Sequence, residues 1–259
     1  MLTRAISCDS LRSVTIVNIA SAIFDRSAPD LGSCPDESLP EFAFIGRSNV
    51  GKSSLLNLLA GGRKLARVSP TPGFTKMINF FTVNKTWRLV DLPGYGFAQV
   101  ARKDKAKFNQ AVADYLQERP NLCCVFALID SSLPPQLLDL EFVEWLADSS
   151  VPFVLVFTKI DKSSKATVQA NIAAFQARIA EWCETLPEIY LCSSTERQGR
   201  ADLLKVIELA LADWKNAPVV EPEVDPEPMA DPEPEPPMSE VPPAIRQTRS
   251  RPSKLTRPW

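Results

Sequence analysis

The sequence predicts a three-layer α/β domain, with helices on both faces of a mixed, mostly parallel β-sheet that includes one antiparallel hairpin pair. Two observations lead to this prediction. Short apolar runs alternate along the chain with segments whose apolar residues recur at helical spacing, which is typical of βα units. Four short motifs also come directly after predicted strands, and the carboxyl ends of strands are where open α/β sheets bind ligands.

Six segments are expected to form strands because each is a short, mostly apolar run bounded by polar or turn-forming residues. The run over residues 122–129 is apolar throughout, as expected for a strand buried on both faces. Asn84 and Lys85 lie between two of the runs, and a connection of two residues predicts a β-hairpin. The predicted strands are residues 42–45, 78–83, 86–91, 122–129, 153–157 and 189–191.

Five segments are expected to form helices because their apolar residues lie three or four positions apart, on one helical face. The first should end at Gly61 and Gly62, since glycine favours the end of a helix. We interpret the apolar stripes as faces packed on the core, and we assign no chemistry to their aromatic residues. The predicted helices are residues 53–60, 103–119 and 137–146, a fourth marked by Val168, Ile172, Phe175, Ile179 and Trp182, and a fifth marked by Leu203, Ile207, Leu211 and Trp214.

A change of composition divides the chain. Residues 217–259 contain 12 of the 23 prolines and eight acidic residues, and no aromatic residue before Trp259. Proline ends helices and favours extended chain, so we expect this tail to be disordered. Its basic carboxyl end leaves open whether the tail is a solvated extension or contacts RNA or an acidic partner. The predicted parts are an amino-terminal extension over 1–19, a folded domain over 20–216 and a proline-rich tail over 217–259.

Composition and charge exclude several functional classes. Residues 1–216 contain 24 basic and 23 acidic residues, so their charge argues neither for nor against nucleic acid as a partner. The chain has no histidine, which excludes histidine-based catalytic triads and removes the commonest zinc ligand. Its six cysteines show no metal-binding spacing, and we expect reduced thiols in a reducing compartment. We expect this compartment to be cytoplasmic, with an organelle matrix as the alternative. No apolar run reaches the roughly 18 residues that a membrane span needs, and residues 1–20 resemble neither a secretory signal nor a transit peptide.

The first motif follows the strand predicted over residues 42–45. Residues 46–53 read Gly-Arg-Ser-Asn-Val-Gly-Lys-Ser, the phosphate-loop spacing of two glycines followed by a lysine and a hydroxyl residue. Gly46 permits a tight turn, and Gly51 lets backbone N–H groups approach phosphate oxygens. We expect Lys52 to contact the β- and γ-phosphates and Ser53 to ligate Mg²⁺.

Three further motifs predict that the nucleotide is a guanine nucleotide. Asp91-Leu92-Pro93-Gly94 has the spacing Asp-x-x-Gly, in which Asp91 can hold a magnesium-bound water and the Gly94 N–H can sense the γ-phosphate. In Thr158-Lys159-Ile160-Asp161, the carboxylate can accept hydrogen bonds from guanine N1–H and from the N2 amine, a pair that adenine does not offer. Backbone N–H groups of Cys192-Ser193-Ser194 can meet guanine O6. Four motifs in this order, each at the carboxyl end of a predicted strand, predict a GTP-binding domain.

A magnesium-dependent switch also needs a hydroxyl residue between the first helix and the hairpin. Residues 69–76 contain two candidates, Thr71 and Thr75, and both are eligible on chemistry alone. The threonine that is not used would be a capping or surface residue of a turn.

Together these motifs resemble the EngB family (also called YihA or YsxC) of small bacterial-type GTPases. The resemblance extends from about residue 20 to residue 215. It is specific because the combination of DLPGYG with TPGxT is unusual among phosphate-loop proteins. It is carried by residues 46–55, TPGFTKMINFF at 71–81, DLPGYGFA at 91–98 and the Thr158 to Asp161 motif, with support from residues 27–30, 114–116, 128–131, 139–141 and 192–194.

The resemblance implies a Ras-like fold and an enzyme that hydrolyses GTP to GDP and phosphate. It selects Thr75 over Thr71, so that Ser53 and Thr75 would ligate the metal and Lys52, Thr75 and Gly94 would act in catalysis. Thr158 departs from the asparagine of most GTPases, but the family shares this threonine. The implied nucleotide-binding residues are Gly46, Arg47, Ser48, Asn49, Val50, Gly51, Lys52, Ser53, Gly73, Phe74, Thr75, Lys76, Met77, Asp91, Leu92, Pro93, Gly94, Thr158, Lys159, Ile160, Asp161, Cys192, Ser193 and Ser194.

Hydrolysis is expected to be slow. Tyr95 stands directly after Asp-x-x-Gly, where Ras-type enzymes place a glutamine that orients water. A phenol with its high pKa is a poor general base, so Lys52, Mg²⁺ and loop N–H groups would supply the charge stabilisation. Asn49 lies where similar cation-stimulated GTPases use an asparagine to help bind K⁺, and a purely structural role in the loop is the alternative.

The implied partners are GTP or GDP and the large ribosomal subunit, through its RNA or a ribosomal protein, with no membrane and with a monomeric chain. The resemblance implies a switch in assembly of that subunit, needed for normal cell division and septation. An adaptor that acts through the proline-rich tail is the alternative. A metabolic phosphotransferase or ATPase lacks support because Asp161 favours guanine and no second substrate domain is evident.

Overall fold

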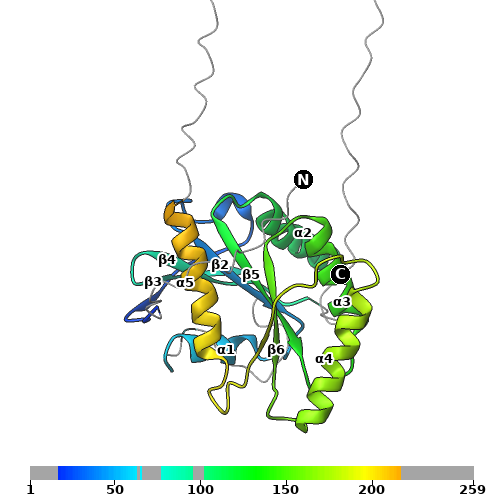
Figure 1. The fold of residues 1–259 in the computed structure, drawn as a ribbon. Helices are drawn as coiled ribbons and strands as arrows, with labels where there is room; N and C mark the ends of the chain where they lie inside the picture. Colours follow the sequence, from blue (N-terminus) through cyan, green and yellow to red (C-terminus); the bar gives the residue numbers. More distant parts are fainter. Residues whose placement is uncertain (1–16, 63–64, 66–76, 96–101, 217–259) are drawn as a thin grey trace, which may run out of the picture. The chain divides into compact units, whose positions relative to one another are not determined.

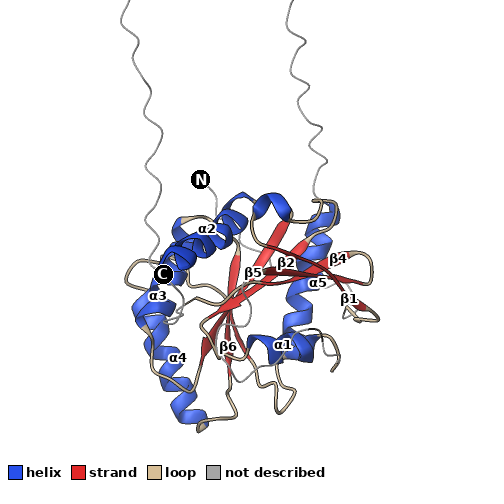
Figure 2. Ribbon diagram, turned by 180° about the vertical axis from the view of Figure 1, so that it is seen from behind, coloured by secondary structure: helices blue, strands red, loops and turns tan. Residues whose placement is uncertain are grey.

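The computed structural model describes residues 17–62, 65, 77–95 and 102–216. In these residues a β-sheet lies between two layers of helices, which Figures 1 and 2 show from opposite sides. The three-layer α/β class predicted from the sequence is confirmed. The division at residues 19/20 and 216/217 stays a prediction, because residues 1–16 and 217–259 lie outside the described part.

The strands of the described part are β1 (Ala22–Ala28), β2 (Glu41–Gly46), β3 (Ile78–Val83), β4 (Trp87–Asp91), β5 (Leu122–Asp130), β6 (Phe153–Thr158) and β7 (Ile189–Leu191). They form one sheet in the order β1-β3-β4-β2-β5-β6-β7. All pairs from β4 to β7 are parallel, whereas β3 pairs antiparallel with both β1 and β4. The mixed, mostly parallel sheet with its β3–β4 hairpin is therefore confirmed.

The described helices are α1 (Lys52–Leu59), α2 (Arg102–Glu118), α3 (Leu137–Asp148), α4 (Lys165–Ile179) and α5 (Arg200–Asn216), with a short 3₁₀ turn η1 (Leu31–Ser33). Side chains of α1 and α5, such as Leu55 and Leu204, pack in one apolar layer of the core. Tyr115 of α2, Phe142 of α3 and Phe175 of α4 pack in the layer on the other face. Within the described residues, no helix combines the length and the apolar character needed to cross a bilayer.

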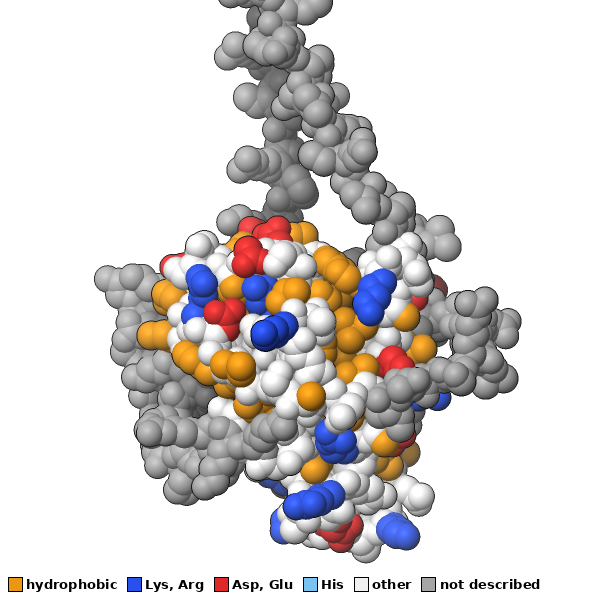
Figure 3. Space-filling view, turned by 90° about the vertical axis from the view of Figure 1, so that its left-hand side faces the viewer, with side chains coloured by type: hydrophobic (Ala, Val, Ile, Leu, Met, Phe, Trp, Pro, Cys, Tyr) orange, Lys and Arg blue, Asp and Glu red, His pale blue; other side chains and the backbone are white. Residues whose placement is uncertain are grey.

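The edge strand β1 is not among the strands predicted from the sequence. Its residues from Ile23 to Ser27 are exposed, and Ile23 and Phe24 expose 62% and 54% of their surface. A strand with so little buried surface has neither the alternation nor the apolar run that marks a strand in sequence. Figure 3 shows the side of the molecule that carries this edge of the sheet, with apolar side chains interspersed among charged ones.

The end of α1 and the β3–β4 hairpin both occur where they were predicted, but the hairpin connection differs in length. The N–H groups of Gly61 and Gly62 donate to the carbonyl oxygens of Leu58 and Asn57, the two bonds of a Schellman motif that ends α1. In the β3–β4 hairpin, Trp87 pairs directly with Val83. The connection therefore has three residues, and the predicted connection of two residues was wrong by one.

Two tryptophans depart from the predicted helical stripes. The fourth helix ends at Ile179, so Trp182 lies beyond it, although its side chain packs partly buried against the same core. Trp214 of α5 is 37% exposed, whereas Leu203 and Ile207 of the same helix are buried.

Candidate functional site

The predicted motifs meet at one edge of the sheet. The strands β2, β4, β5, β6 and β7 are parallel, so their carboxyl ends lie at the same edge. The phosphate loop follows β2, Asp91 is the last residue of β4, Thr158 is the last residue of β6, and Cys192 follows β7. Parallel topology thus brings together motifs that are separated by more than a hundred residues in the sequence.

The phosphate loop leads from β2 directly into α1. Asn49 and Gly51 have left-handed backbone conformations, with φ of 65° and 104°, which turn the chain sharply before the helix begins. Gly51 is the N-cap of α1, and no side chain caps the first turn. The first N–H groups of a helix have no acceptor within it, so they can bind an anion at this end.

Two glycines allow the backbones around the loop to approach closely. A Cβ on Gly46 would lie 2.7 Å from the carbonyl oxygen of Leu128 in β5. A Cβ on Gly94 would lie 2.7 Å from the carbonyl oxygen of Gly46 and 3.5 Å from the amide nitrogen of Ser48. The Asp-x-x-Gly motif is therefore packed against the phosphate loop, at a distance that only glycine permits.

The phosphate loop holds a mostly buried lysine and a hydroxyl group without a partner among the described residues. Lys52 forms an ion pair with Asp91, and their side chains are only 10% and 4% exposed. Ser48 Oγ is buried and has no hydrogen-bond partner in the described part of the chain. Buried polar groups in proteins are nearly always paired, so this loop has capacity left for a polar ligand.

The donor set fits Mg²⁺ bound together with a phosphate group. The Ser53 hydroxyl and the Asp91 carboxylate are oxygen donors, which this hard cation prefers. Within the described residues, no group of three or more acidic or cysteine side chains could hold a metal ion by itself. Such a site would depend on oxygen atoms of the ligand, as is usual for Mg²⁺ bound with phosphates.

Thr158 joins the predicted base-recognition motif to the phosphate loop. Its hydroxyl donates to the carbonyl oxygen of Val50 at 2.6 Å and lies 3.2 Å from that of Ile129. Its neighbour Lys159 has a left-handed backbone, with φ of 60°, and pairs with Asp130 at 2.6 Å. The position of the base-recognition motif is thus fixed relative to the loop that would hold the phosphates.

Asp161 lies beside the Cys192-Ser193-Ser194 segment. The Ser193 hydroxyl donates to Asp161 Oδ1 at 2.7 Å, and Lys162 Nζ lies 3.2 Å from Oδ2. The hydrogen bond from Ser193, with help from Lys162, lowers the pKa of the Asp161 carboxyl below its ordinary value. Asp161 is therefore ionised at neutral pH and oriented by its neighbours.

The three N–H groups of the last motif are not equivalent. The Cys192 N–H donates to the carbonyl oxygen of Phe157, and the Ser193 N–H donates to that of Gln198. In the described part, this leaves Ser194 as the only residue of the motif whose N–H has no backbone acceptor. Cys192 is itself buried, which raises the pKa of its thiol to about 12 and keeps it protonated.

Tyr95 does not face an open site but is buried beneath it. Its hydroxyl donates to Asp139 Oδ1 of α3 at 3.0 Å, and its ring packs on Phe142 at 4.5 Å between centroids. Burial, together with the charge of Asp139, raises the pKa of Tyr95 well above its ordinary value. Arg47 Nε of the phosphate loop contacts the same carboxylate at 2.9 and 3.1 Å. Arg47, Tyr95 and Asp139 all lie in motifs that are recognisable in the sequence, but no sequence pattern indicates that they meet.

Part of the predicted site is not described. Gly73, Phe74, Thr75 and Lys76 lie outside the described residues, as does the alternative candidate Thr71. Met77 is described, and it is 47% exposed.

Comparison with known proteins agrees with this geometry. Residues 41–159 match the family described as 50S ribosome-binding GTPase. Proteins named probable GTP-binding protein EngB from Bacteroides fragilis and Phocaeicola vulgatus are 46% and 47% identical over 192 residues. These alignments cover 74% of this chain and 96% of each relative.

Solved structures show the same fold. A crystal structure of a probable GTP-binding protein EngB has a TM-score of 0.55 at 22% identity, over 66% of this chain and 98% of that one. Era of Aquifex aeolicus bound to GDP and AlF4⁻ has a TM-score of 0.52 at 24% identity, over 68% of this chain and 56% of that one. Given the relatives that are 46–47% identical over nearly their whole length, the chain belongs to the EngB family of GTPases.

Proposed function

We propose that the protein binds GTP and GDP at the carboxyl edge of its sheet and acts as a GTP-controlled switch. The observation that carries this proposal is the convergence of the phosphate loop, Asp91, the Asp161 carboxylate and the Ser194 N–H at one sheet edge. The proposed contacts are made by residues 46–53, 73–77, 91–94, 158–161 and 192–194.

In this proposal each part of the site has a separate role. Lys52 and the free N–H groups at the start of α1 bind phosphate oxygens, and the Gly94 N–H senses the γ-phosphate. Ser53 and Thr75 hold Mg²⁺, which neutralises phosphate charge when it is bound. Asp161 accepts from guanine N1–H and the N2 amine. Because the N–H groups of Cys192 and Ser193 are already bonded, Ser194 donates to guanine O6.

We propose that intrinsic hydrolysis is slow because Tyr95 stands where Ras-type enzymes place a glutamine that orients water, and a phenol is a poor general base. The described position of Tyr95 supports this proposal, since its hydroxyl is buried and bonded to Asp139. Charge stabilisation by Lys52, Gly94 and Thr75 would then account for most of the rate.

If Asn49 helps to bind K⁺, GTP hydrolysis should be faster in KCl than in NaCl at equal ionic strength, as measured by phosphate release. The variant Asn49→Gly removes the side chain while tolerating the left-handed backbone at this position, and it should lose the difference between the salts. Equal rates of the wild-type protein in the two salts would instead give Asn49 a purely structural role.

We further propose that the partner is the large ribosomal subunit and that the protein acts in its assembly in the cytoplasm, with consequences for cell division and septation. The match to a family described as 50S ribosome-binding GTPase supports this proposal. Basic residues adjoin TPGFT at 71–75 and DLPGYG at 91–96, the two segments that we expect to reorder when GTP replaces GDP, and they could supply affinity for ribosomal RNA. They are Arg63, Lys64, Arg67, Arg102, Lys103, Lys105 and Lys107.

Protein loaded with a non-hydrolysable GTP analogue should co-sediment with purified large subunits better than protein loaded with GDP. The association should weaken with salt, because contacts to phosphates release counterions. The double variant Lys103→Glu and Lys105→Glu should reduce it, whereas the same charge change at the exposed Lys205 and Lys215 of α5 should not. Binding that ignores the nucleotide, the salt and the first pair of lysines would contradict the proposal.

A further inference from the structure

Three residues from three different elements meet in one buried cluster beneath the phosphate loop. Asp139 of α3 is 1% exposed and accepts from the Tyr95 hydroxyl and from Arg47 Nε. Tyr95 is 2% exposed, and its backbone also pairs with Arg47 in an isolated parallel bridge. The residue that follows Gly94 is thus bonded to the phosphate loop through its backbone and to α3 through its side chain.

The cluster acts on the proposed γ-phosphate sensor at short range. Gly94 lies between Asp91, which is paired with Lys52, and Tyr95, which is bonded to Asp139. Its Cα is so close to the loop that a Cβ would meet the Gly46 carbonyl oxygen at 2.7 Å. Fixing the residue on one side of a glycine restricts the orientation of that glycine's own N–H, because a peptide unit has only two soft dihedral angles per residue.

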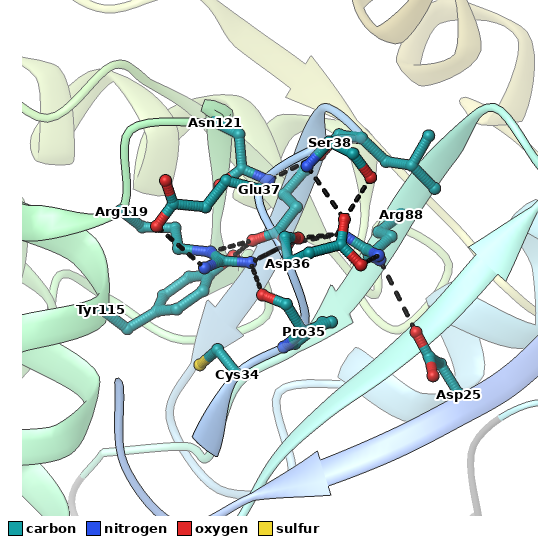
Figure 4. Close-up of polar contacts among 12 residues, drawn as sticks. Asp25, Cys34, Pro35, Asp36, Glu37, Ser38, Arg88, Tyr115, Arg119 and Asn121 are labelled. Atoms are coloured by element: carbon teal, nitrogen blue, oxygen red, sulfur yellow. Dashed lines mark hydrogen bonds and ion pairs between the residues drawn. The ribbon is translucent and has the colours of Figure 1, made fainter. Parts of the chain in front are cut away.

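A second cluster of the same chemistry lies at the other end of the parallel strands, where Glu41 begins β2 (Figure 4). There the Tyr115 hydroxyl donates to Glu41 Oε2 at 2.8 Å, and Arg119 Nε donates to the same oxygen at 2.9 Å. Glu41 and Tyr115 are fully buried, like Asp139 and Tyr95. The residues that the structure describes therefore include two buried tyrosine–carboxylate–arginine clusters, and of these two only the one around Asp139 touches the candidate site.

We infer that Tyr95, Asp139 and Arg47 are positioning residues that hold the Gly94 N–H in the orientation that favours GTP over GDP. The inference rests on the proposed function of this site. Only GTP has a γ-phosphate for the Gly94 N–H to meet, so a loss of order at Gly94 weakens GTP binding and leaves GDP binding nearly unchanged. Through Asp139, the same contact connects the nucleotide state to α3.

The test compares the two clusters by removing one hydroxyl group from each. The quantity measured is the affinity for a non-hydrolysable GTP analogue in the presence of Mg²⁺, divided by the affinity for GDP. In Tyr95→Phe, this ratio should fall on the order of tenfold, the usual effect of losing one hydrogen bond to a charged group. In Tyr115→Phe, the ratio should equal that of the wild-type protein. Both variants lose a buried hydrogen bond to a carboxylate, so their melting temperatures should fall by similar amounts and a general loss of stability cannot explain a difference in the ratio.

A second matched pair, Asp139→Asn and Glu41→Gln, removes the charge of each carboxylate while keeping its shape. The ratio should fall in Asp139→Asn alone, and this pair decides the question if Tyr95→Phe does not fold. A ratio that is unchanged at Tyr95 and Asp139, or that falls equally in both clusters, overturns the inference while GDP binding by the wild-type protein still supports the proposed function. Failure of the wild-type protein to bind any guanine nucleotide overturns the proposed function itself.

Discussion

Asp161→Ala should lower the affinity for GDP by about ten- to a hundred-fold and remove the preference for GDP over ADP. The carboxylate is ionised and is held in place by Ser193 and Lys162. Two donors of guanine face a single charged acceptor, and a hydrogen bond to a charged group contributes roughly 1.5–3 kcal/mol. The measurement is a titration of each diphosphate into both proteins, with the melting temperature as a check of folding.

Two further variants make this prediction sharper. Asp161→Asn replaces one acceptor oxygen by an NH₂ donor. This donor cannot bond to the N2 amine of guanine, which is also a donor, but it can donate to the O2 oxygen of xanthine. This variant should bind xanthosine diphosphate better than GDP. Lys162→Ala removes the ion pair but keeps the carboxylate, so GDP affinity should change by much less. Unchanged GDP affinity in Asp161→Ala would remove the main argument against an ATP enzyme.

The sequence predicted most of the fold because the buried elements have strong patterns. The apolar run in β5 is buried almost throughout, and the predicted limits of β3 and β7 agree with the structure. The exposed strand β1 had no such pattern, because its place at the sheet edge depends on pairing with β3 rather than on burial.

The site was predicted by its motifs but not by its contacts. Asp161 and Ser193 could be placed together because both follow neighbouring parallel strands. The bond from Thr158 to Val50 spans 108 residues, and that from Arg47 to Asp139 spans 92 residues. Such contacts depend on how a helix packs over a particular loop, which neither spacing nor composition records.

The buried cluster around Glu41 has the largest expected effect on stability. Glu41, the first residue of β2, is fully buried, and Arg119 binds it with Nε at 2.9 Å and Nη2 at 2.7 Å. Arg119 also donates to the carbonyl oxygen of Pro35 at 2.7 Å, so it joins the segment before β2 to the end of α2 (Figure 4). A fully buried carboxylate is tolerated only because these donors surround it.

Arg119→Ala should lower the free energy of unfolding by about 3–5 kcal/mol, because it leaves the Glu41 charge buried with its main partner removed. Chemical denaturation followed by tryptophan fluorescence measures this change. The double variant Arg119→Met and Glu41→Met should be less damaging than Arg119→Ala alone, since apolar groups of similar size leave no unpaired charge.

Glu37→Ala is the matched control for this prediction. Glu37 also pairs with Arg119, at 3.4 Å, but its side chain is 56% exposed, and an exposed ion pair contributes only about 0–1 kcal/mol. The two acidic partners of Arg119 should therefore differ severalfold in importance, because Glu41 is buried and bound by two nitrogen atoms, whereas Glu37 is exposed and bound by one. If Arg119→Ala and Glu37→Ala cost the same, the Glu41 charge must be reached by water in solution, and the buried cluster would not fix the segment before β2 to α2.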